Sequence, residues 1–507
     1  MTTIVVADNA ALNAVLYGAL QPGDRVEISP GTYTGYHSIN GKHGTATQPI
    51  TITAADPDNP PVFSTSATCG LQAIGCSYLS VKHIAFDYNR DIGLFFQHAT
   101  PRPFDTLSDC HHVEVSDCTF TRTGQGDWGN HDGIKLTGVD HFAVRRCTID
   151  GWGDGGGSGV DVVGSQYGLI DGCSLRNPQQ APSGTATGIT IKGGSRSVEV
   201  SGCLLYAAGK PGIQIGQDTG IQYFRSPPGS TLSDGTVVDY EAKEIEVWNN
   251  TILDNKCGIY WGKSSGGRAH HNTIVQSNTS STERSPFQIS ALAVAPLLQS
   301  HHGRMDHNLI VYRWKKLYWW AVPFVRRTVA DANTLTFTFD SNAWYQTDIA
   351  TEGQHWPNVV GALGLPTADG NAIYQIDPQL SGIDANGLPT GDPVRITSLD
   401  PALADIGAHY EETPDMTLLT GCSDPDGDAI TAELVTQATN GVAVVNPDGT
   451  GSYTPNAGFA GVDTFAYRVS DGSAFSSPAT VTVTVLNQAP TAADHTYSTP
   501  KNTPVTL

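Results

Sequence analysis

The sequence has few charged residues, and few of those are basic. Only 15% of the 507 residues are Asp, Glu, Lys or Arg, and 49 acidic side chains against 28 basic ones give a formal net charge of -21. This balance argues against a nucleic acid as partner, because phosphate binding needs a basic surface. A local basic cleft is still compatible with it. The 55 glycines and 30 prolines favour a turn-rich all-β protein over a helical one.

Targeting and membrane-spanning segments are missing as well. The start, Met1-Thr-Thr-Ile-Val-Val-Ala-Asp, lacks the basic residues and the apolar run of a secretory signal. No stretch is long and apolar enough to insert into a bilayer. We nevertheless expect an extracellular protein, whose signal either was removed or is a C-terminal export signal beyond Leu507. A chain of this length suits two or three domains, and we expect a monomer.

A repeated strand pattern organises the middle of the chain. Each copy begins with a small or polar residue and a glycine, alternates apolar and variable positions, and ends on glycine. Alternation with period two indicates a strand with one buried face, and its recurrence predicts a solenoid of stacked coils. The copies are Asp132–Gly138, Ser158–Gly164, Thr187–Gly193, Pro211–Gly216 and Cys257–Gly262.

A second motif recurs in phase with the first, at intervals of 22 to 47 residues. A constant motif at variable spacing predicts a parallel β-helix with corner loops of unequal length, right-handed as parallel crossovers nearly always are. We expect the stacked cysteines to be reduced, because in-register side chains run parallel and suit a disulfide poorly. The asparagines should hydrogen-bond along the axis. The anchors are Cys118, Cys147, Cys173, Cys203, Asn250, Asn272 and Asn308.

Aligning the repeats predicts which side chains face outward together. One column contains Lys135, Asp161, Thr190, Gln214 and Tyr260, and the column two residues further on contains Thr137, Val163 and Lys192. Coils stack about 4.8 Å apart, so these residues should share one surface. The alternative is a solvated face with scattered polar residues. Gly193 and Gly194 favour a site, because they are expected to leave space around Lys192.

Three loops are expected to border this surface. Two are the glycine-rich loops Gly126–Asp132 and Gly151–Gly157, which contribute His131 and Asp154 unless they are simple tight turns. Lys210, which directly precedes the repeat Pro211–Gly216, is expected to lie nearby. A long loop from about Gln217 to Glu241 contains Tyr223 and Arg225 and is expected to fold over Lys192, since long loops in compact domains are usually functional.

The N-terminal region carries a family resemblance. After a helical cap at about residues 8–20 come Gln21-Pro-Gly-Asp, Pro30-Gly-Thr-Tyr-Thr-Gly and Gly44-Thr-Ala-Thr-Gln-Pro-Ile-Thr-Ile-Thr-Ala-Ala. These phrases resemble the opening of β-helical polysaccharide lyases of family 6, which include chondroitinase B and alginate lyases. The resemblance covers about Thr3 to Glu411 and ends with Ala404-Asp-Ile-Gly-Ala-His.

The resemblance implies cleavage of a uronate chain by β-elimination. In the family a lysine removes the C5 proton, an arginine one coil later assists the leaving group, and calcium binds the carboxylate. Lys192 matches the lysine. The calcium positions are occupied by Thr185 and Thr187, and Lys210–Gln214 stands in place of the arginine. Lys135 or Arg225 is therefore expected to pair with the substrate carboxylate, and Tyr223 to act as the acid.

Two other readings stay open. Asp132, Asp154 and Asp161 lie in successive coils, and paired carboxylates are what a glycoside hydrolase uses; an epimerase with the same architecture is a related alternative. A carbohydrate-binding or adhesive solenoid without catalysis is the third reading. For the surface around Lys192 we expect Gln214, Tyr260, His131 and Lys210 to contact the sugar chain, with no certain cofactor in the groove.

The C-terminal part has a different pattern. We place the β-helix at residues 1–411, a β-sandwich at 412–487 and the truncated start of a further repeat at 488–507, because short alternating strands follow Glu411 at frequent turns. This text resembles cadherin-like tandem repeats of bacterial secreted proteins. Asp424, Asp426 and Asp428 are expected to bind Ca²⁺ together with Asp471, the alternative being a solvated acidic turn. No glutamate or helices of an EF-hand are present.

Overall fold

The computed structural model describes residues 2–485 with internal gaps, and all structural statements concern the described residues. The chain divides into two compact units, Met1–Tyr410 and Glu411–Leu507, which are described separately. The gaps are residues 67, 125–130, 154–155, 178–185, 207, 217–218, 277–284, 291–296, 314–324, 328–335, 348, 353–364, 366, 382–394, 399, 404–405, 409–417, 420–421, 423–429, 448, 450, 457–458 and 460.

The first unit is built from three long parallel sheets, which we call sheets A, B and C. Sheet A contains, in spatial order, β1 (Thr3–Val6), β2 (Arg25–Ile28), β5 (Ile50–Ala54), β8 (Ser77–Lys82), β11 (His111–Ser116), β14 (Asp140–Arg145), β17 (Gln166–Asp171), β20 (Ser195–Ser201), β24 (Glu246–Trp248), β28 (Arg268–His270), β31 (Arg304–Asp306), β34 (Thr338–Asp340) and β36 (Asp369–Gly370), with β23 (Ala242–Lys243) and β27 (Ser264–Ser265) beside it. Sheet B contains β3 (Thr32–Tyr33), β6 (Val62–Phe63), β9 (Ala85–Asp87), β12 (Thr119–Thr123), β15 (Thr148–Trp152), β18 (Ser174–Arg176), β21 (Leu204–Tyr206), β25 (Thr251–Leu253), β29 (Thr273–Gln276), β32 (Leu309–Tyr312), β35 (Ala343–Gln346) and β37 (Ile373–Tyr374). Sheet C contains β4 (His37–Asn40), β7 (Cys69–Ile74), β10 (Ile92–Gln97), β13 (Asp132–Thr137), β16 (Gly157–Val163), β19 (Ala186–Lys192), β22 (Pro211–Ile215), β26 (Cys257–Gly262), β30 (Ser285–Ser290) and β33 (Val325–Arg327).

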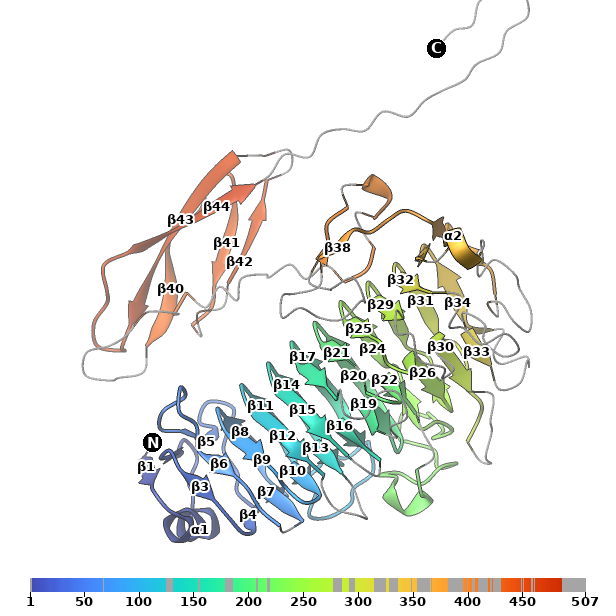
Figure 1. The fold of residues 1–507 in the computed structure, drawn as a ribbon. Coiled ribbons are helices and arrows are strands. Elements are labelled where there is room, and N and C mark those ends of the chain that lie inside the picture. The colour runs from blue at the N-terminus through green and yellow to red at the C-terminus, as the bar shows by residue number, and fades with distance from the viewer. Residues whose placement is uncertain are drawn as a thin grey trace, which may run out of the picture. The chain divides into compact units, whose positions relative to one another are not determined.

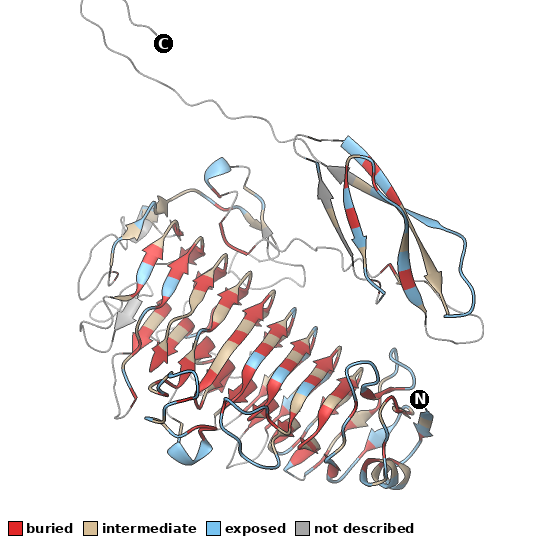
Figure 2. Cartoon of the chain, turned by 180° about the vertical axis from the view of Figure 1, so that it is seen from behind, coloured by how far each residue is buried: buried red, intermediate tan, exposed pale blue. Residues whose placement is uncertain are grey.

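The chain visits the three sheets in turn, and each circuit is one coil of a parallel β-helix (Figure 1). Successive coils pair in register, so the apolar position of each repeat stacks on that of the next. These inward side chains are fully buried and form the continuous core, seen as buried stripes across the strands in Figure 2. The predicted fold is confirmed, and one inward column of the core contains Ile134, Val160, Ile189, Ile213 and Ile259.

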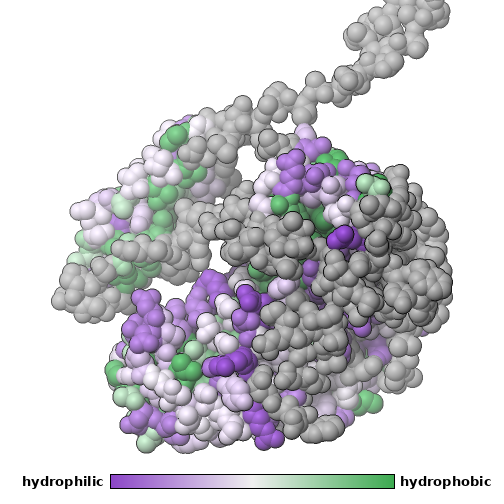
Figure 3. Space-filling view, in the orientation of Figure 1, coloured by the Kyte–Doolittle hydropathy of each residue, from purple (hydrophilic) through white to green (hydrophobic). Residues whose placement is uncertain are grey.

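A short helix covers the N-terminal end of the core. It is α1 (Asn9–Tyr17), and it begins after Asp8, whose carboxylate accepts the Ala11 N–H at 2.8 Å. Such a cap satisfies one of the free N–H groups of the first turn. Leu12 and Leu16, four residues apart on one face, are buried against the first coils. Elsewhere on the N-terminal coils, polar and near-neutral side chains cover most of the described surface that Figure 3 shows.

The asparagine anchors of the second motif stack on successive coils as predicted, and this asparagine ladder extends one coil further, to Asn342. Each Oδ1 accepts the backbone N–H of the preceding ladder residue, for example from Asn250 to Asn272 at 3.1 Å and from Asn272 to Asn308 at 3.0 Å. The amide Nδ2 groups donate to the next Oδ1 and to backbone carbonyls of the neighbouring coil. The ladder ends on Asp369, where burial raises the carboxyl pKa to about 6.

The cysteines of the ladder are free and buried, and so are four others in the β-helix. Burial raises the pKa of the Cys147 and Cys203 thiols, which makes them poor nucleophiles in the folded protein. We predict that thiol titration of the denatured, unreduced protein finds all nine cysteines, matching a reduced sample. Substantially fewer thiols in the unreduced sample would show that disulfides form despite the parallel side chains.

Buried histidines should make the β-helix sensitive to acid. His37 is 1% exposed, and its Nδ1 contacts Asn13 Oδ1 at 2.9 Å. Burial lowers the pKa of His37, His98 and His301 below the ordinary value of 6.5. The unfolded chain therefore binds protons more readily, so the stability these groups contribute is complete above about pH 6.5 and is lost as the pH falls below it. For His37 the slope reaches up to about 1.4 kcal/mol per pH unit.

The measurement is the melting temperature from about pH 7.5 down to about pH 5. His37→Gln should weaken the dependence, whereas His141→Gln, at an exposed position, should leave it unchanged. A His37→Gln protein that keeps the wild-type slope would contradict the assignment.

The remaining described elements lie towards the C-terminus. In the first unit they are α2 (Ile349–Glu352) and the antiparallel pair β38 (Leu380–Ser381) and β39 (Arg395–Ile396). The second unit has one antiparallel sheet of β40 (Thr431–Thr436), β43 (Gly461–Ser470) and β44 (Ala479–Val485), and another of β41 (Gly441–Val445) and β42 (Gly451–Pro455). Leu418, Ala438, Ala443 and Phe465 form its small buried core.

Candidate active site

A pocket of about 270 Å³ lies where the ends of neighbouring strands of sheet C meet the loop that follows β22. Strands β13, β16 and β19 contribute one wall, and the loop contributes the other. The register places Lys135 beside Asp161 and Val163 beside Lys192, as the two predicted outward columns require. The lining residues are Lys135, Thr137, Val163, Lys192, Thr219, Gly220 and Tyr223.

A buried carboxylate joins the two lysines of the pocket. Asp161 is 1% exposed and lies between them. Its Oδ2 pairs with Lys135 Nζ, and its Oδ1 lies 3.1 Å from Lys192 Nζ. Lys135 also pairs with Asp132 Oδ2 at 3.0 Å, and Asp132 Oδ1 accepts the Ser158 N–H at 2.8 Å. The result is a compact cluster of two ammonium groups and two carboxylates, in which Lys192 is the more exposed cation.

The environment shifts the pKa values of the Asp132 and Asp161 carboxyl groups in opposite directions. Burial raises the pKa of Asp132 above its usual range, and the nearby Asp161 charge adds to the effect. Burial would also raise the pKa of Asp161, but Lys135 and Lys192 together lower it below its ordinary value. For Lys135, burial alone would lower the pKa, yet the two carboxylates raise it. Asp161 and Lys135 are therefore ionised at neutral pH, and Asp132 is the member that takes up a proton most readily.

The opposite wall of the pocket is formed by the loop that follows β22, which we call the arch. Its single helical turn, Ile221–Tyr223, carries Tyr223, which is 62% exposed and lines the pocket. Glu241, at the end of the loop, is fully buried and accepts the Thr219 N–H at 2.8 Å and the Gly193 N–H at 2.9 Å. One carboxylate thus holds both the arch and the turn after Lys192. The role of Glu241 was not predictable from the sequence, since a glutamate at a loop end carries no signal of its own.

Arg225 does not serve the role predicted for it. Its side chain is buried and pairs with the buried Asp140 of β14, with Nη2 to Oδ2 at 3.0 Å. Nε donates to the Arg102 carbonyl at 2.7 Å, and Nη2 donates to the carbonyls of Pro103 and Thr106. With these bonds made, Arg225 fastens the arch to the loop before β11, and its side chain is too deeply buried to meet a substrate.

The glycines after Lys192 also act differently from the expectation. Both have positive φ, +68° at Gly193 and +84° at Gly194, so they turn the chain from β19 into β20. A Cβ on Gly193 would lie 2.8 Å from the Val163 side chain. On Gly194 it would lie against Phe104 and Phe224. They are needed for a left-handed turn under close packing, and they do not open space around the lysine.

Other predicted contact residues lie away from the pocket. Gln214 is buried, accepts the Thr187 hydroxyl at 3.4 Å and donates to the Gly216 carbonyl. His131 is 1% exposed. Tyr260 stands next to Gln214 in register but does not line the pocket. Lys210 directly precedes β22 and so lies at the N-terminal ends of the sheet C strands, away from the pocket.

The acids of the hydrolase reading are poorly placed. Asp132 and Asp161 are buried, bonded to Lys135 and absent from the pocket lining. Asp154 lies outside the described residues. The calcium implied by the resemblance does not fit either: Thr187 is bonded to Gln214, and Thr185 lies outside the described residues. Within the described ranges no group of three or more His, Cys, Asp or Glu side chains could hold a metal.

Of the predicted calcium ligands of the second unit, only Asp471 lies within the described residues. Asp424, Asp426 and Asp428 lie outside the described residues. Asp471 accepts the N–H groups of Ser473 and Ala474, both at 2.6 Å, and these bonds lower its pKa. That arrangement closes a turn by itself, so calcium binding by this unit stays a prediction.

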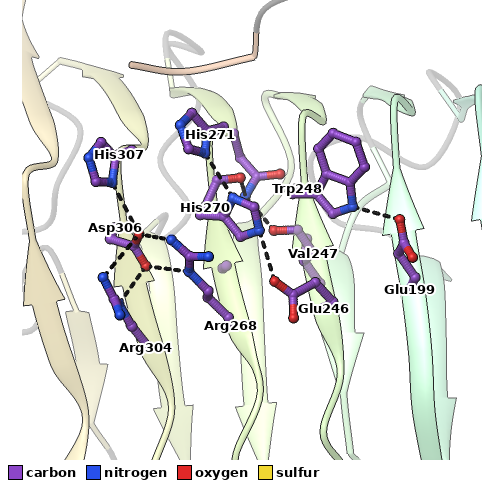
Figure 4. Close-up of polar contacts among 12 residues, drawn as sticks. Glu199, Glu246, Val247, Trp248, Arg268, His270, His271, Arg304, Asp306 and His307 are labelled. Atoms are coloured by element: carbon purple, nitrogen blue, oxygen red, sulfur yellow. Dashed lines mark hydrogen bonds and ion pairs between the residues drawn. The ribbon is translucent and has the colours of Figure 1, made fainter. Parts of the chain in front are cut away.

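A second polar cluster lies on the outward face of sheet A (Figure 4). Asp306 is buried and bonded by Arg268, Arg304 and His307, with Arg304 Nε at 2.9 Å. Glu246 accepts from His270 Nε2 at 2.8 Å. Burial raises the pKa of Asp306, but Arg268 and His307 outweigh it and lower the pKa. Two guanidinium groups and the His307 imidazole share the one buried carboxylate of Asp306, and Glu246 is bonded to His270, so the charged groups of this cluster are engaged with one another.

Comparisons with known proteins agree with the fold. A sequence model of the right handed beta helix region matches residues 106–280, and a model of the bacterial Ig domain matches residues 399–484. The chain is thus a right-handed parallel β-helix followed by an Ig-like domain, as predicted. No curated protein matches the sequence. In the described part of the chain no helix is long and apolar enough to cross a membrane.

Several solved structures resemble the chain at low identity. An alginate lyase from Paenibacillus sp. str. FPU-7 is 19% identical over 74% of this chain and 97% of its own, with a TM-score of 0.40. A rhamnogalacturonan lyase is 13% identical over 80% and 100%, with a TM-score of 0.48. A lacto-N-biosidase from Eubacterium ramulus is 14% identical over 64% and 65%, with a TM-score of 0.38. The function therefore has to be argued from the site.

Proposed function

We propose that the protein is a polysaccharide-degrading enzyme of the lyase type, which cleaves a uronate-containing chain by β-elimination. One observation carries the proposal: Lys192 and Tyr223, an amine and a phenol, face the same pocket from opposite walls. Elimination needs a base for the C5 proton and an acid for the departing oxygen. The match of Lys192 to the lyase lysine supports the same assignment.

The Lys192 amine takes the C5 proton, the freed electron pair forms the C4–C5 double bond, and the C4–O bond breaks. The Tyr223 hydroxyl protonates the leaving oxygen and regains a proton from solvent or from Lys192. The products are a new non-reducing end with an unsaturated uronate and a chain ending in a free hydroxyl, so no water is consumed.

Asp132 and Asp161 are assigned a supporting role. Both are buried, bonded to Lys135 and absent from the pocket lining. Asp161 also lies 3.1 Å from Lys192 Nζ. The two aspartates would thus position the two lysines rather than contact the sugar.

Lys135 is the other cation that lines the pocket among the described residues. An ammonium group has three donors, and Asp132 and Asp161 occupy two of them. The third is available for the substrate carboxylate, whose neutralisation makes the C5 proton more acidic. Because such polymers lie outside cells, we place the activity in the extracellular space.

The test is incubation with a panel of uronate polymers, followed by absorbance in the unsaturated-uronate band. A rise in absorbance together with new reducing ends is expected for at least one polymer. New reducing ends without absorbance would indicate hydrolysis, and binding without new ends would indicate a carbohydrate-binding solenoid. Either outcome would overturn the lyase proposal.

A further inference from the structure

Two lysines at one corner of the β-helix have no carboxylate partner in the described part of the chain. Lys210 and Lys256 immediately precede β22 and β26, and the paired residues Pro211 and Cys257 place them in the same position of successive coils. Their backbones are therefore about 4.8 Å apart. Backbone bonds fix both positions, since the Lys210 N–H donates to the Ala186 carbonyl and the Lys256 carbonyl accepts the Ser285 N–H.

The arrangement is unusual for this chain. Most described lysines and arginines pair with a carboxylate, as Lys82 does with Glu114 at 2.9 Å and Lys192 with Asp161. Among the described residues no carboxylate lies within ion-pair distance of Lys210 or Lys256. Burial lowers the pKa of Lys210, and the charge of Lys256 lowers it further, with no acid acting in the other direction.

Such a pair costs free energy in the free protein. The two ammonium groups repel each other, and the Lys256 charge accordingly lowers the pKa of Lys210. In a molecule of net charge -21 a carboxylate could easily have been present to neutralise them. An anion that bridges the two ammonium groups removes the repulsion and gains two charge-assisted hydrogen bonds. Lys256 is exposed and Lys210 half-buried, so a ligand can reach both.

The lysine pair lies at the N-terminal ends of the sheet C strands, whereas the pocket lies at their C-terminal ends. Lys210 is level with Ala186, and Lys192 lies six residue steps further along β19, a distance of roughly 20 Å along the strand. A single sugar ring is much shorter than that. An anion at the lysine pair would therefore belong to another residue of the chain bound at Lys192.

We propose that Lys210 and Lys256 form a carboxylate subsite, which binds a second uronate of the polysaccharide several sugars away from the one at Lys192. This inference rests on the proposed function for the identity of the ligand, and it narrows the substrate class to polymers with uronates at more than one position along the chain. A polymer with a single isolated uronate would lack the second contact.

The binding test separates this subsite from the pocket. In the full chain carrying Lys192→Ala, a short oligogalacturonate at constant ionic strength should raise the melting temperature by about 1–2 °C relative to chloride. Adding Lys210→Gln and Lys256→Gln should remove this shift. Adding Lys82→Gln, which removes a lysine of sheet A, should leave it intact. A shift that survives in the Lys210→Gln/Lys256→Gln protein overturns the proposal, and so does the absence of any shift in the Lys192→Ala protein.

The kinetic test uses the polymer that gives an unsaturated product. Lys210→Gln/Lys256→Gln should raise KM about tenfold and leave kcat within about twofold, because the subsite binds substrate and transition state equally. An unchanged KM overturns the subsite and leaves the lyase proposal standing. If no polymer gives an unsaturated product while the melting-temperature difference holds, the lyase proposal falls and the lysine site remains.

Discussion

Replacing Lys192 by alanine should lower kcat on a uronate polymer by about 10²- to 10⁴-fold, the usual contribution of a general base. The fold should be largely spared, because the Lys192 side chain is 21% exposed and its partner Asp161 keeps the ion pair with Lys135. Lys192→Arg should fail almost as completely, since a guanidinium does not release its proton at working pH. The measurements are the initial rate of unsaturated product and the melting temperature of each variant.

The choice of variants decides what the loss means. Lys82→Ala, which removes a partly exposed, ion-paired lysine from sheet A, should keep normal turnover. Tyr223→Phe removes only the hydroxyl of an exposed residue and should slow the reaction without affecting stability. Near-normal turnover in Lys192→Ala would refute the base assignment. Full activity in Lys192→Arg would instead show that the residue acts through its charge.

Lys135→Ala is a weaker probe than the sequence suggested. On sequence grounds it should weaken substrate binding more than it slows the chemical step. The structure shows Lys135 bonded to both Asp132 and Asp161, whereas Lys192 is bonded to Asp161 alone, so removing Lys135 would leave the buried Asp132 carboxylate without its cation. Loss of stability would then obscure any effect on binding.

The sequence predicts the scaffold well because the β-helix repeats one local rule. Inward residues recur with period two along each strand and in register between coils, so the columns through Ile134 and Lys135 follow from alignment alone. The asparagine ladder is predictable for the same reason, since each rung repeats the last. Its extension to Asn342 was missed because the motif is less regular there.

Contacts that join distant parts of the chain were not predictable in this way. Arg225 lies in a loop outside the repeat, and its partner Asp140 is 85 residues earlier in the sequence. Its charge and its place in a long loop suggested an arginine that pairs with the substrate carboxylate, and only the folded loop shows that its side chain is buried in an ion pair with Asp140. Gly193 was misread for a related reason, because the need for positive φ and the nearby Val163 side chain come from the turn and from the neighbouring coil.

Breaking the Arg225–Asp140 pair should cause the largest loss of stability of any single change to the site. Arg225→Met would leave Asp140, which is fully buried, with the Ser108 N–H but no cation, and stranding a buried charge costs about 3–5 kcal/mol. Arg122→Met is the matched control: it removes an exposed ion pair with Asp87 and should cost less than about 1 kcal/mol. Thermal and denaturant unfolding of the two variants give the comparison.

The pair also links stability to function, because Arg225 fastens the loop that carries Tyr223. When Arg225 is lost, the arch keeps the bond from Thr219 to Glu241, the bond from the Phe104 N–H to Ser226 Oγ and the packing of Phe224 against Phe104. Tyr223 would therefore stay tethered but would lose the ionic anchor two residues away, and its position over the pocket would be less fixed. Turnover should therefore fall in Arg225→Met at temperatures where the protein is still folded, although Lys192 is untouched. Arg225→Met combined with Asp140→Leu removes both charges and should recover much of the stability without restoring the anchor. If that double variant regained full turnover, the loop would not need this anchor to position Tyr223, and the stability loss alone would explain the single variant.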